Sequence, residues 1–315
     1  MVTRLGNRKC LNSDLVHVHW PEHLARGSTR TLRVLSPLYL AFVVALLQRP
    51  RAPALVWTIH NLEPHERAGS AVEQWLERRF FSYLAKRVDV VVILVDSQRS
   101  VVRNRFGFSA QTPLHHVPEG ITHRPIPLPP SSSGPIKLAS IGSISPYKGF
   151  VHLAEAFSSV PADVASLHIA GRPDSVDEVR LLTEHEAKGH IVFEPRRLSE
   201  GEMDFLLEDS HALIVAHHEQ FNSGSPWTAL GANRPVIIVD SELATDLQQA
   251  VGQDWVFILP ADFGPKEIGH AIEWAGQPRA PLNATQFDWP VVTARLVNAY
   301  ETAILRRKAK RYQAR

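Results

Sequence analysis

The sequence predicts an α/β protein with two doubly wound domains, each built around a parallel sheet. The length of 315 residues suits two domains of ordinary size better than one compact core. Apolar residues make up 44% of the chain, so both domains can bury real cores. β-Branched segments alternate with helical patterns on both sides of a proline-rich stretch, which is typical of parallel sheets covered by helices.

Three β-branched segments of the first half end at polar clusters and are predicted as strands. They cover residues 15–19, 54–59 and 88–95. The unbroken hydrophobicity of 88–95 favours a central strand that is buried on both faces. Helical patterns lie between the strands at about 29–48 and 71–86, so strand and helix alternate.

A stretch of prolines and serines separates the two halves. Residues 126–135 have a composition that resists helix and sheet and favours an extended linker. We therefore expect an N-terminal domain at 1–125, a second domain at 136–285, and a C-terminal helix with a basic tail at 286–315. Strands of the second domain are expected at 136–141, 165–170, 190–193, 212–216 and 235–239, with helices near 150–158, 176–188, 200–208 and after Pro226.

Charge and cysteine content narrow the class of protein. The 34 basic and 32 acidic residues give a formal charge of +2, without the basic excess of a nucleic-acid-binding protein. The single cysteine, Cys10, fits a reducing compartment. No secretory leader and no apolar run long enough for a bilayer are evident, so we expect a cytoplasmic protein. The basic run 304–315 is either a solvated helix end or a contact with an anionic membrane surface.

Two segments of the second half have the pattern of phosphate-binding loops. Residues 138–149 run from a strand past Gly142 and Lys148 into a helix, and free N–H groups with a nearby ammonium favour an anion. Residues 219–236 follow another strand, and Ser225 before a proline is typical of a helix start. The carboxyl ends of parallel strands share one crevice, so we expect the two loops to hold one diphosphate.

With these motifs, the second half resembles the GT-B glycosyltransferases related to family four, which assemble polysaccharides and glycolipids. Gly142 and Lys148 match the family loop that holds the donor diphosphate, and the family arginine of that loop falls on Ser143. Glu219 matches the first of two family glutamates. The second glutamate, which holds the donor ribose in the family, falls on Thr228.

The loop before this helix resembles that of bacterial exopolysaccharide transferases. Some members of that branch invert the anomeric centre, so retention and inversion both stay open. The resemblance assigns donor binding to Gly142, Ser143, Lys148, Glu219, Ser223, Gly224, Ser225 and Thr228.

In the first half, two strand-end motifs at 14–22 and 58–66 resemble those that face the donor sugar in these enzymes. His60 matches the family histidine that contacts the transferred sugar. The carboxylates and imidazoles that follow it are candidates for a general base toward an acceptor hydroxyl. His17 is expected to be a core histidine. The catalytic candidates are His60, Glu63, His65 and His19.

The resemblance implies a GT-B fold, with two Rossmann-like domains facing a central cleft. Only 13 residues precede Asp14, fewer than the family has there, so it also implies a shortened N-terminal domain. No Asp-x-Asp pair occurs in the chain, and the GT-B arrangement holds diphosphate without a metal, so we expect no metal or cofactor.

The implied function is transfer of a sugar, mannose among the candidates, from a nucleoside-diphosphate sugar to a saccharide or lipid-linked acceptor. This reaction would belong to cell-surface polysaccharide biosynthesis, in the cytoplasm or at the inner face of the plasma membrane. Two alternatives stay open: a sugar-nucleotide epimerase of the same fold, and a non-catalytic sugar-nucleotide-binding partner subunit. The expected partners are a sugar nucleotide, the acceptor and an anionic membrane surface, and not nucleic acid.

Overall fold

The computed structural model describes residues 13–21, 42, 45, 49, 52–62, 71–129, 134–186, 189–217 and 222–313. Most of the helix predicted at 29–48 lies outside these ranges. The chain forms two compact units, one of residues Met1–Pro118 with Pro290–Arg315 and one of residues Glu119–Trp289.

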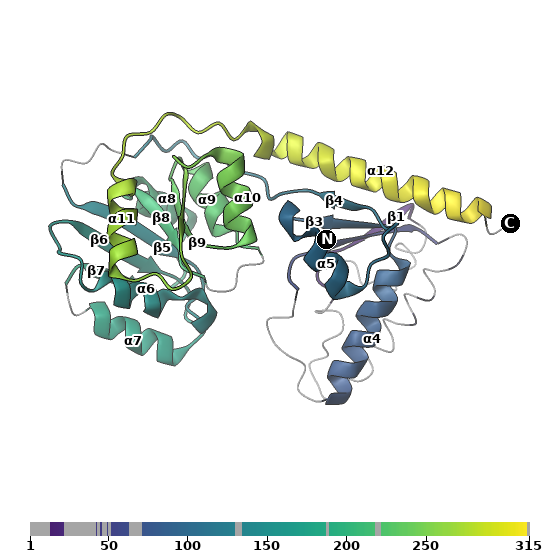
Figure 1. Cartoon of the computed structure of the whole chain (residues 1–315), viewed down its shortest axis with the longest axis horizontal. Helices are drawn as coiled ribbons and strands as arrows, with labels where there is room; N and C mark the ends of the chain where they lie inside the picture. The colour runs from purple at the N-terminus through teal and green to yellow at the C-terminus, as the bar shows by residue number, and fades with distance from the viewer. Residues whose placement is uncertain are drawn as a thin grey trace. The chain divides into compact units, whose positions relative to one another are not determined.

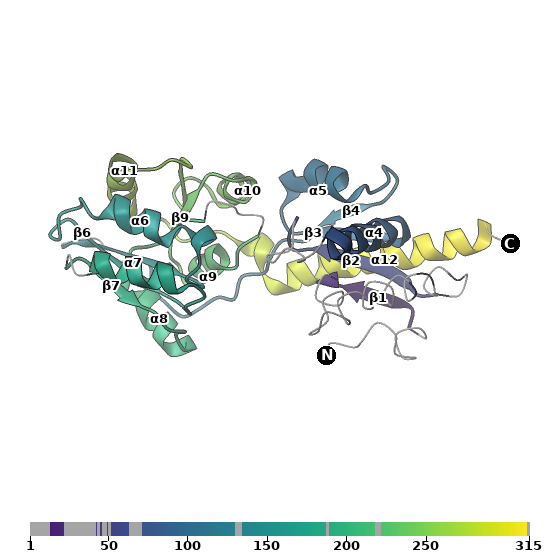
Figure 2. The same cartoon turned by 90° about the horizontal axis from the view of Figure 1, so that it is seen from below.

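The described strands of the first unit form a parallel sheet in the order β1-β2-β3-β4. Figure 1 labels β1, β3 and β4, and Figure 2 labels all four strands. The strands are β1 Leu15–Val18, β2 Ala54–Ile59, β3 Val90–Ile93 and β4 Leu114–His116. The first three confirm the predicted strands, and β4 is an addition that its short apolar run did not reveal. Every residue of β3 is buried, as the prediction of a central strand requires.

Helices cover both faces of this sheet, which explains why β2 is buried along its whole length. On one face, the ring of Trp57 packs against Phe81 and Phe106, with ring centroids 5.8 and 5.0 Å apart. On the other face, Val56 belongs to a cluster with Val292 and other residues of the C-terminal helix. The period of two along a strand therefore sends alternate side chains to two different helical layers. The helices are α4 Ala71–Arg87, α5 Arg99–Phe106 and α12 Trp289–Gln313, with the short 3₁₀ helix η1 Asp96–Gln98.

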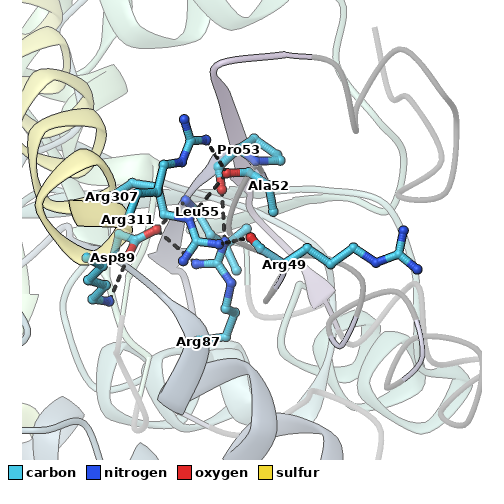
Figure 3. A network of polar contacts seen from close by, with 9 residues as sticks. Arg49, Ala52, Pro53, Leu55, Arg87, Asp89, Arg307 and Arg311 are labelled. Atoms are coloured by element: carbon cyan, nitrogen blue, oxygen red, sulfur yellow. Dashed lines mark hydrogen bonds and ion pairs between the residues drawn. The ribbon is translucent and has the colours of Figure 1, made fainter. Parts of the chain in front are cut away.

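A buried polar network fastens α12 to the first unit (Figure 3). The Asp89 carboxylate is 0% exposed and accepts hydrogen bonds from the Leu55 N–H, Arg87 and Lys310 at 3.0, 2.9 and 2.8 Å. Arg307 and Arg311 both donate to the carbonyl of Ala52, at 3.2 and 2.7 Å. Three cations of the predicted basic tail therefore contact the protein itself.

The second unit contains a six-stranded parallel sheet in the order β10-β9-β8-β5-β6-β7, of which β5 to β9 are labelled in Figure 1. This is the doubly wound order. The chain adds strands from β5 outward to β7, then returns to the other side of β5 and adds β8 to β10 in the opposite direction. The five predicted strands are confirmed, and β10 is an addition. The strands are β5 Ile136–Ile141, β6 Ala165–Ala170, β7 Ile191–Glu194, β8 Ala212–Val215, β9 Val236–Val239 and β10 Val256–Leu259.

Amphipathic helices close the core of the second unit. Phe150, Leu153 and Phe157 share one helix face at spacings of three and four and are almost fully buried against the sheet. Ser199 and Glu202 form a capping box that fixes the start of another helix. The helices are α6 Phe150–Phe157, α7 Val176–Glu186, α8 Glu200–Asp209, α9 Ser225–Gly231, α10 Glu242–Val251 and α11 Pro265–Ala275, with the 3₁₀ helices η2 Pro146–Lys148 and η3 Thr285–Phe287.

The boundary between the units differs from the predicted linker at 126–135. Residues 119–127 belong to the second unit, because Asn233 donates to the carbonyl of Ile126 and Arg234 to that of Pro127, both at 2.7 Å. The guanidinium of Arg234 is completely buried and also donates to the Leu207 carbonyl at 2.6 Å. The predicted C-terminal segment 286–315 is divided, since residues up to Trp289 belong to the second unit and the rest to the first.

Candidate functional site

The loops that follow β5 and β6 are locked together at the carboxyl edge of the second sheet. The Ile144 N–H donates to the Arg172 carbonyl at 2.7 Å, and the Asp174 N–H donates to the Ile144 carbonyl at 3.0 Å. A Cβ atom at Gly171 would lie 1.6 Å from the Gly142 carbonyl oxygen, so only glycine permits this approach. The two strand ends therefore form one rigid wall.

This wall borders a pocket of about 420 Å³. Loops after β5, β6 and β7 and the start of α8 and α9 contribute to it. Among the predicted donor-binding residues, the structure brings Gly142, Ser143 and Thr228 together here. The lining residues are Arg124, Ile141, Gly142, Ser143, Ala170, Gly171, Arg172, Arg197, Leu198, Ser199, Glu200, Met203 and Thr228.

Arginines give the pocket a positive lining that the sequence did not reveal. Arg172 forms an ion pair with Asp174 at 3.1 Å, and Arg124 forms one with Asp204. Arg197 has no ion pair within the described part of the chain. Its neighbour Arg196 instead pairs with glutamates outside the pocket. A guanidinium with free donors in a pocket of this size suits phosphate oxygens.

Lys148 stands beside the same wall. It ends η2, and Gly149, with φ of 67°, makes the left-handed turn into α6. The Lys148 ammonium donates to His217 Nδ1 at 3.4 Å and lies 5.1 Å from the Tyr147 ring centroid. Its Cε is 4.0 Å from where a Cβ would stand at Gly142. Burial lowers the pKa of Lys148 to about 8.

The segment before α9 adjoins the end of β5. Ser223 is buried, and the Ser225 hydroxyl donates to the Ile141 carbonyl at 3.3 Å. The Thr228 hydroxyl donates to the Gly224 carbonyl at 3.1 Å, so its proton is used within the helix. Ser225 thus contacts the last residue of β5, directly before Gly142, and Ser223 and Gly224 precede it in the chain. Glu219 lies outside the described residues.

In the first unit, the structure brings the predicted His19 and His60 into contact. His19 Nδ1 and His60 Nε2 are 3.0 Å apart, so the two rings share one proton. Trp20 stacks on His60, with ring centroids 4.2 Å apart. His17 makes hydrogen bonds with the hydroxyls of Tyr300 and Thr58, at 2.8 and 2.7 Å, and is the core histidine that the sequence predicted.

All three histidines are held neutral near pH 7. Burial, with the neighbouring imidazoles, lowers the pKa of His17 to about 3 and that of His60 to about 4. Burial also lowers the pKa of His19. A neutral imidazole has a lone pair that can accept a proton, although a pKa lowered to about 4 makes His60 a weaker base than a free histidine. Glu63 and His65 lie outside the described residues, and no cluster of metal ligands is present among the residues that the structure describes.

Two curated relatives match most of the chain. Both are GDP-mannose:glycolipid 4-beta-D-mannosyltransferases of Xanthomonas campestris pv. campestris, 27% and 28% identical over 283 residues. Each match covers 88% of this chain and 76% of the relative. No family model matches the chain.

Solved glycosyltransferases share the fold. Sucrose-phosphate synthase from Thermosynechococcus elongatus superposes with a TM-score of 0.63 at 15% identity, over 91% of this chain and 73% of that one. The lipopolysaccharide outer core galactosyltransferase WaaB gives 0.61 at 12%, over 86% and 81%. The GtfA/B complex gives 0.60 at 14% over 83% of this chain, which spans only 55% of that structure. The chain is a GT-B glycosyltransferase.

One polar residue of this glycosyltransferase escaped the sequence analysis. Glu119 follows the first unit in an irregular segment, where neither strand nor helix periodicity marks it. Its Oε2 atom is buried and has no hydrogen-bond partner among the described residues. A glutamate before a glycine carries no recognisable motif, so only its surroundings in the fold single it out.

Proposed function

We propose that this glycosyltransferase moves a mannosyl group from GDP-mannose to a glycolipid acceptor. The observation that carries the proposal is the arginine-lined pocket at the carboxyl ends of β5 and β6, with Lys148 beside it. The two relatives, named as GDP-mannose:glycolipid mannosyltransferases, suggest the donor and the class of acceptor. We propose that the mannolipid product serves the assembly of a cell-surface polysaccharide.

In the proposed reaction, the bond between the anomeric carbon and the diphosphate breaks, and a bond to the acceptor oxygen forms. Negative charge then develops on the leaving diphosphate. The cations Lys148 and Arg197 would stabilise that charge, as preorganised donors do in a site shielded from water. The role of accepting the hydroxyl proton is proposed for the neutral His19 and His60 pair.

We also propose that donor binding needs no metal. Cationic side chains and backbone N–H groups at the strand ends can neutralise a diphosphate by themselves. Donor binding is therefore expected to survive in excess EDTA.

The proposed acceptor implies contact with a membrane surface. No helix in the described ranges has the length and apolar character of a bilayer-spanning helix. Fewer residues of the basic tail can contact a membrane than the sequence predicted, because Arg307, Lys310 and Arg311 form hydrogen bonds with the first unit. The outer face of α12 keeps Leu305 and Tyr312, which are 66% and 77% exposed, with Lys308 between them. Apolar and basic side chains on one helix face suit an anionic lipid surface.

The proposed function is tested by GDP binding to the full chain in EDTA, measured by calorimetry. Lys148→Ala removes a charge-assisted hydrogen bond and should weaken GDP binding by about 1.5–3 kcal/mol. Guanosine, which has no phosphate, should bind both proteins alike. Lys266→Ala removes an exposed lysine of α11 and serves as the matched control.

Two results would contradict the proposal. The first is GDP affinity in folded Lys148→Ala equal to that of the wild type. The second concerns the products of GDP-mannose and a lipid acceptor: an epimerised sugar without a mannolipid would indicate an epimerase instead.

A further inference from the structure

The segment that carries Glu119 is held tightly against the second unit. The Ile121 N–H donates to the Phe287 carbonyl at 2.8 Å. A Cβ at Gly120 would lie 2.6 Å from the Trp289 ring, and a Cβ at Gly231 would lie 2.4 Å from the Thr122 carbonyl oxygen. Glycine at 231 lets the segment approach the backbone of α9, and glycine at 120 lets it lie against the Trp289 ring. Glu119 therefore has a fixed position.

One oxygen of the Glu119 carboxyl group is buried without a partner among the described residues. Its Oε2 atom is inaccessible to water and accepts no hydrogen bond from the described residues. Burial raises the pKa of Glu119, and no charged neighbour contributes to that shift. Buried polar atoms in native proteins almost always have a partner, because an unsatisfied one is costly. A hydrogen-bond donor from a bound ligand would satisfy this carboxyl oxygen, for which the described residues provide no donor.

The carboxyl group faces the predicted donor loop. Oε2 lies 4.0 Å from where a Cβ would stand at Gly224, the residue between Ser223 and Ser225. The same loop adjoins β5 through the bond from Ser225 to Ile141. A carboxylate repels phosphate oxygens, whereas it accepts hydrogen bonds from hydroxyl groups, so the phosphates are excluded as its partner.

We infer that Glu119 is a donor-binding residue whose carboxyl group holds a hydroxyl of the sugar nucleotide. The inference rests on the proposed function. A hydroxyl can come from the ribose or from the transferred sugar, and the chemistry of recognition is the same for both. In either case the orphaned oxygen gains the partner that the protein lacks.

The test measures binding of GDP-mannose, GDP and 2′-deoxy-GDP to the full chain and to Glu119→Gln. Glutamine keeps the size of the side chain but loses the strong acceptor, so the affected ligands should bind roughly 10- to 100-fold more weakly. Glu155→Gln makes the same chemical change at an exposed position of α6 and should bind all three ligands like the wild type. Thermal unfolding of each variant confirms that it is folded.

The pattern across ligands decides the inference. If Glu119→Gln binds GDP-mannose and GDP more weakly than the wild type does, but binds 2′-deoxy-GDP equally well, the inference is supported and the partner is the ribose 2′-hydroxyl. If only the binding of GDP-mannose is weakened, the inference is supported and the partner is a hydroxyl of the transferred sugar. An equal loss for all three, in a variant shown to be folded, supports it and identifies the ribose 3′-hydroxyl, which all three ligands carry. Binding of all three ligands to Glu119→Gln as tight as to the wild type overturns the inference while the proposed function stands. If the wild type binds none of them, the proposed function falls together with the inference.

Discussion

Lys148 is a residue whose charge depends on its burial. Its pKa is lowered from 10.5 to about 8, because a half-buried ammonium loses hydration that one imidazole does not replace. The folded state therefore releases this proton near pH 8, whereas the unfolded chain keeps it until about pH 10.5. Between these values the unfolded chain binds more protons, so this residue makes the fold more stable as pH rises. The affinity for a bound anion changes in the opposite direction: it falls as pH rises, since only the protonated lysine attracts the anion.

We predict that GDP affinity falls as pH rises above about 8, because neutral Lys148 no longer binds phosphate. A bound diphosphate favours the ammonium, so the fall begins at or above the pKa of the free protein. Calorimetry from pH 7 to 9 measures it, with guanosine to remove changes that come from the base. Lys148→Arg keeps its charge and should show a flatter profile. A wild-type profile as flat as that of Lys148→Arg would argue against a lysine–phosphate contact.

At the scale of elements, α12 is the helix whose role changes most between sequence and structure. Its C-terminal turns carry the basic run that composition marks as a tail. In the fold, Ala299 and Ala303 pack on the sheet and Lys310 reaches the buried Asp89. Small residues on the inner face let the helix lie close to the strands. The last helix is therefore a structural part of the first unit.

We predict that Asp89→Ala destabilises the first unit by about 3–5 kcal/mol, because it leaves the buried guanidinium of Arg87 without its carboxylate. Urea unfolding measures the change. Asp209→Ala is the control, since its ion pair with Lys137 is about half exposed and should cost about 1 kcal/mol or less. Equal effects of the two substitutions would show that the Asp89 network does not hold α12.

At the scale of the whole molecule, charge is nearly balanced, so any attraction to a membrane depends on where the charges lie. Basic side chains that bind the protein's own carboxylates and carbonyls add little attraction. Those on the outer face of α12 remain available, together with the exposed Leu305 and Tyr312.

We predict weak, salt-sensitive binding of the full chain to vesicles of anionic lipid, measured by flotation. The attraction fades over about 10 Å at ~0.1 M salt, so binding should decrease as salt is added. Lys308→Glu combined with Leu305→Ser should reduce binding several-fold, whereas Lys266→Glu in the second unit should not. Unchanged binding of the double variant would exclude the outer face of α12 as the contact.

The sequence by itself determined the architecture and part of the site. Strand periodicity and β-branched content are local properties, so eight strands could be predicted from short windows of sequence. Gly142 and Lys148 were found for a similar reason, because a strand, a glycine loop and a helix start follow each other directly in the chain. The resemblance to glycosyltransferases rested on the same continuous motifs.

Only the tertiary structure decided which distant residues meet. Arg172 and Arg197 reach the pocket from separate loops. Glu119 lies near the donor loop because Gly120 and Gly231 let its segment pack closely against Trp289 and α9. One tail cation is paired by a carboxylate far away in the chain, since Lys310 binds Asp89 across a separation of 221 residues. Arg307 and Arg311 instead donate to the carbonyl of Ala52. Burial and pairing depend on packing between segments that no local pattern connects, and these contacts set the charge and hydrogen-bonding capacity of each site residue.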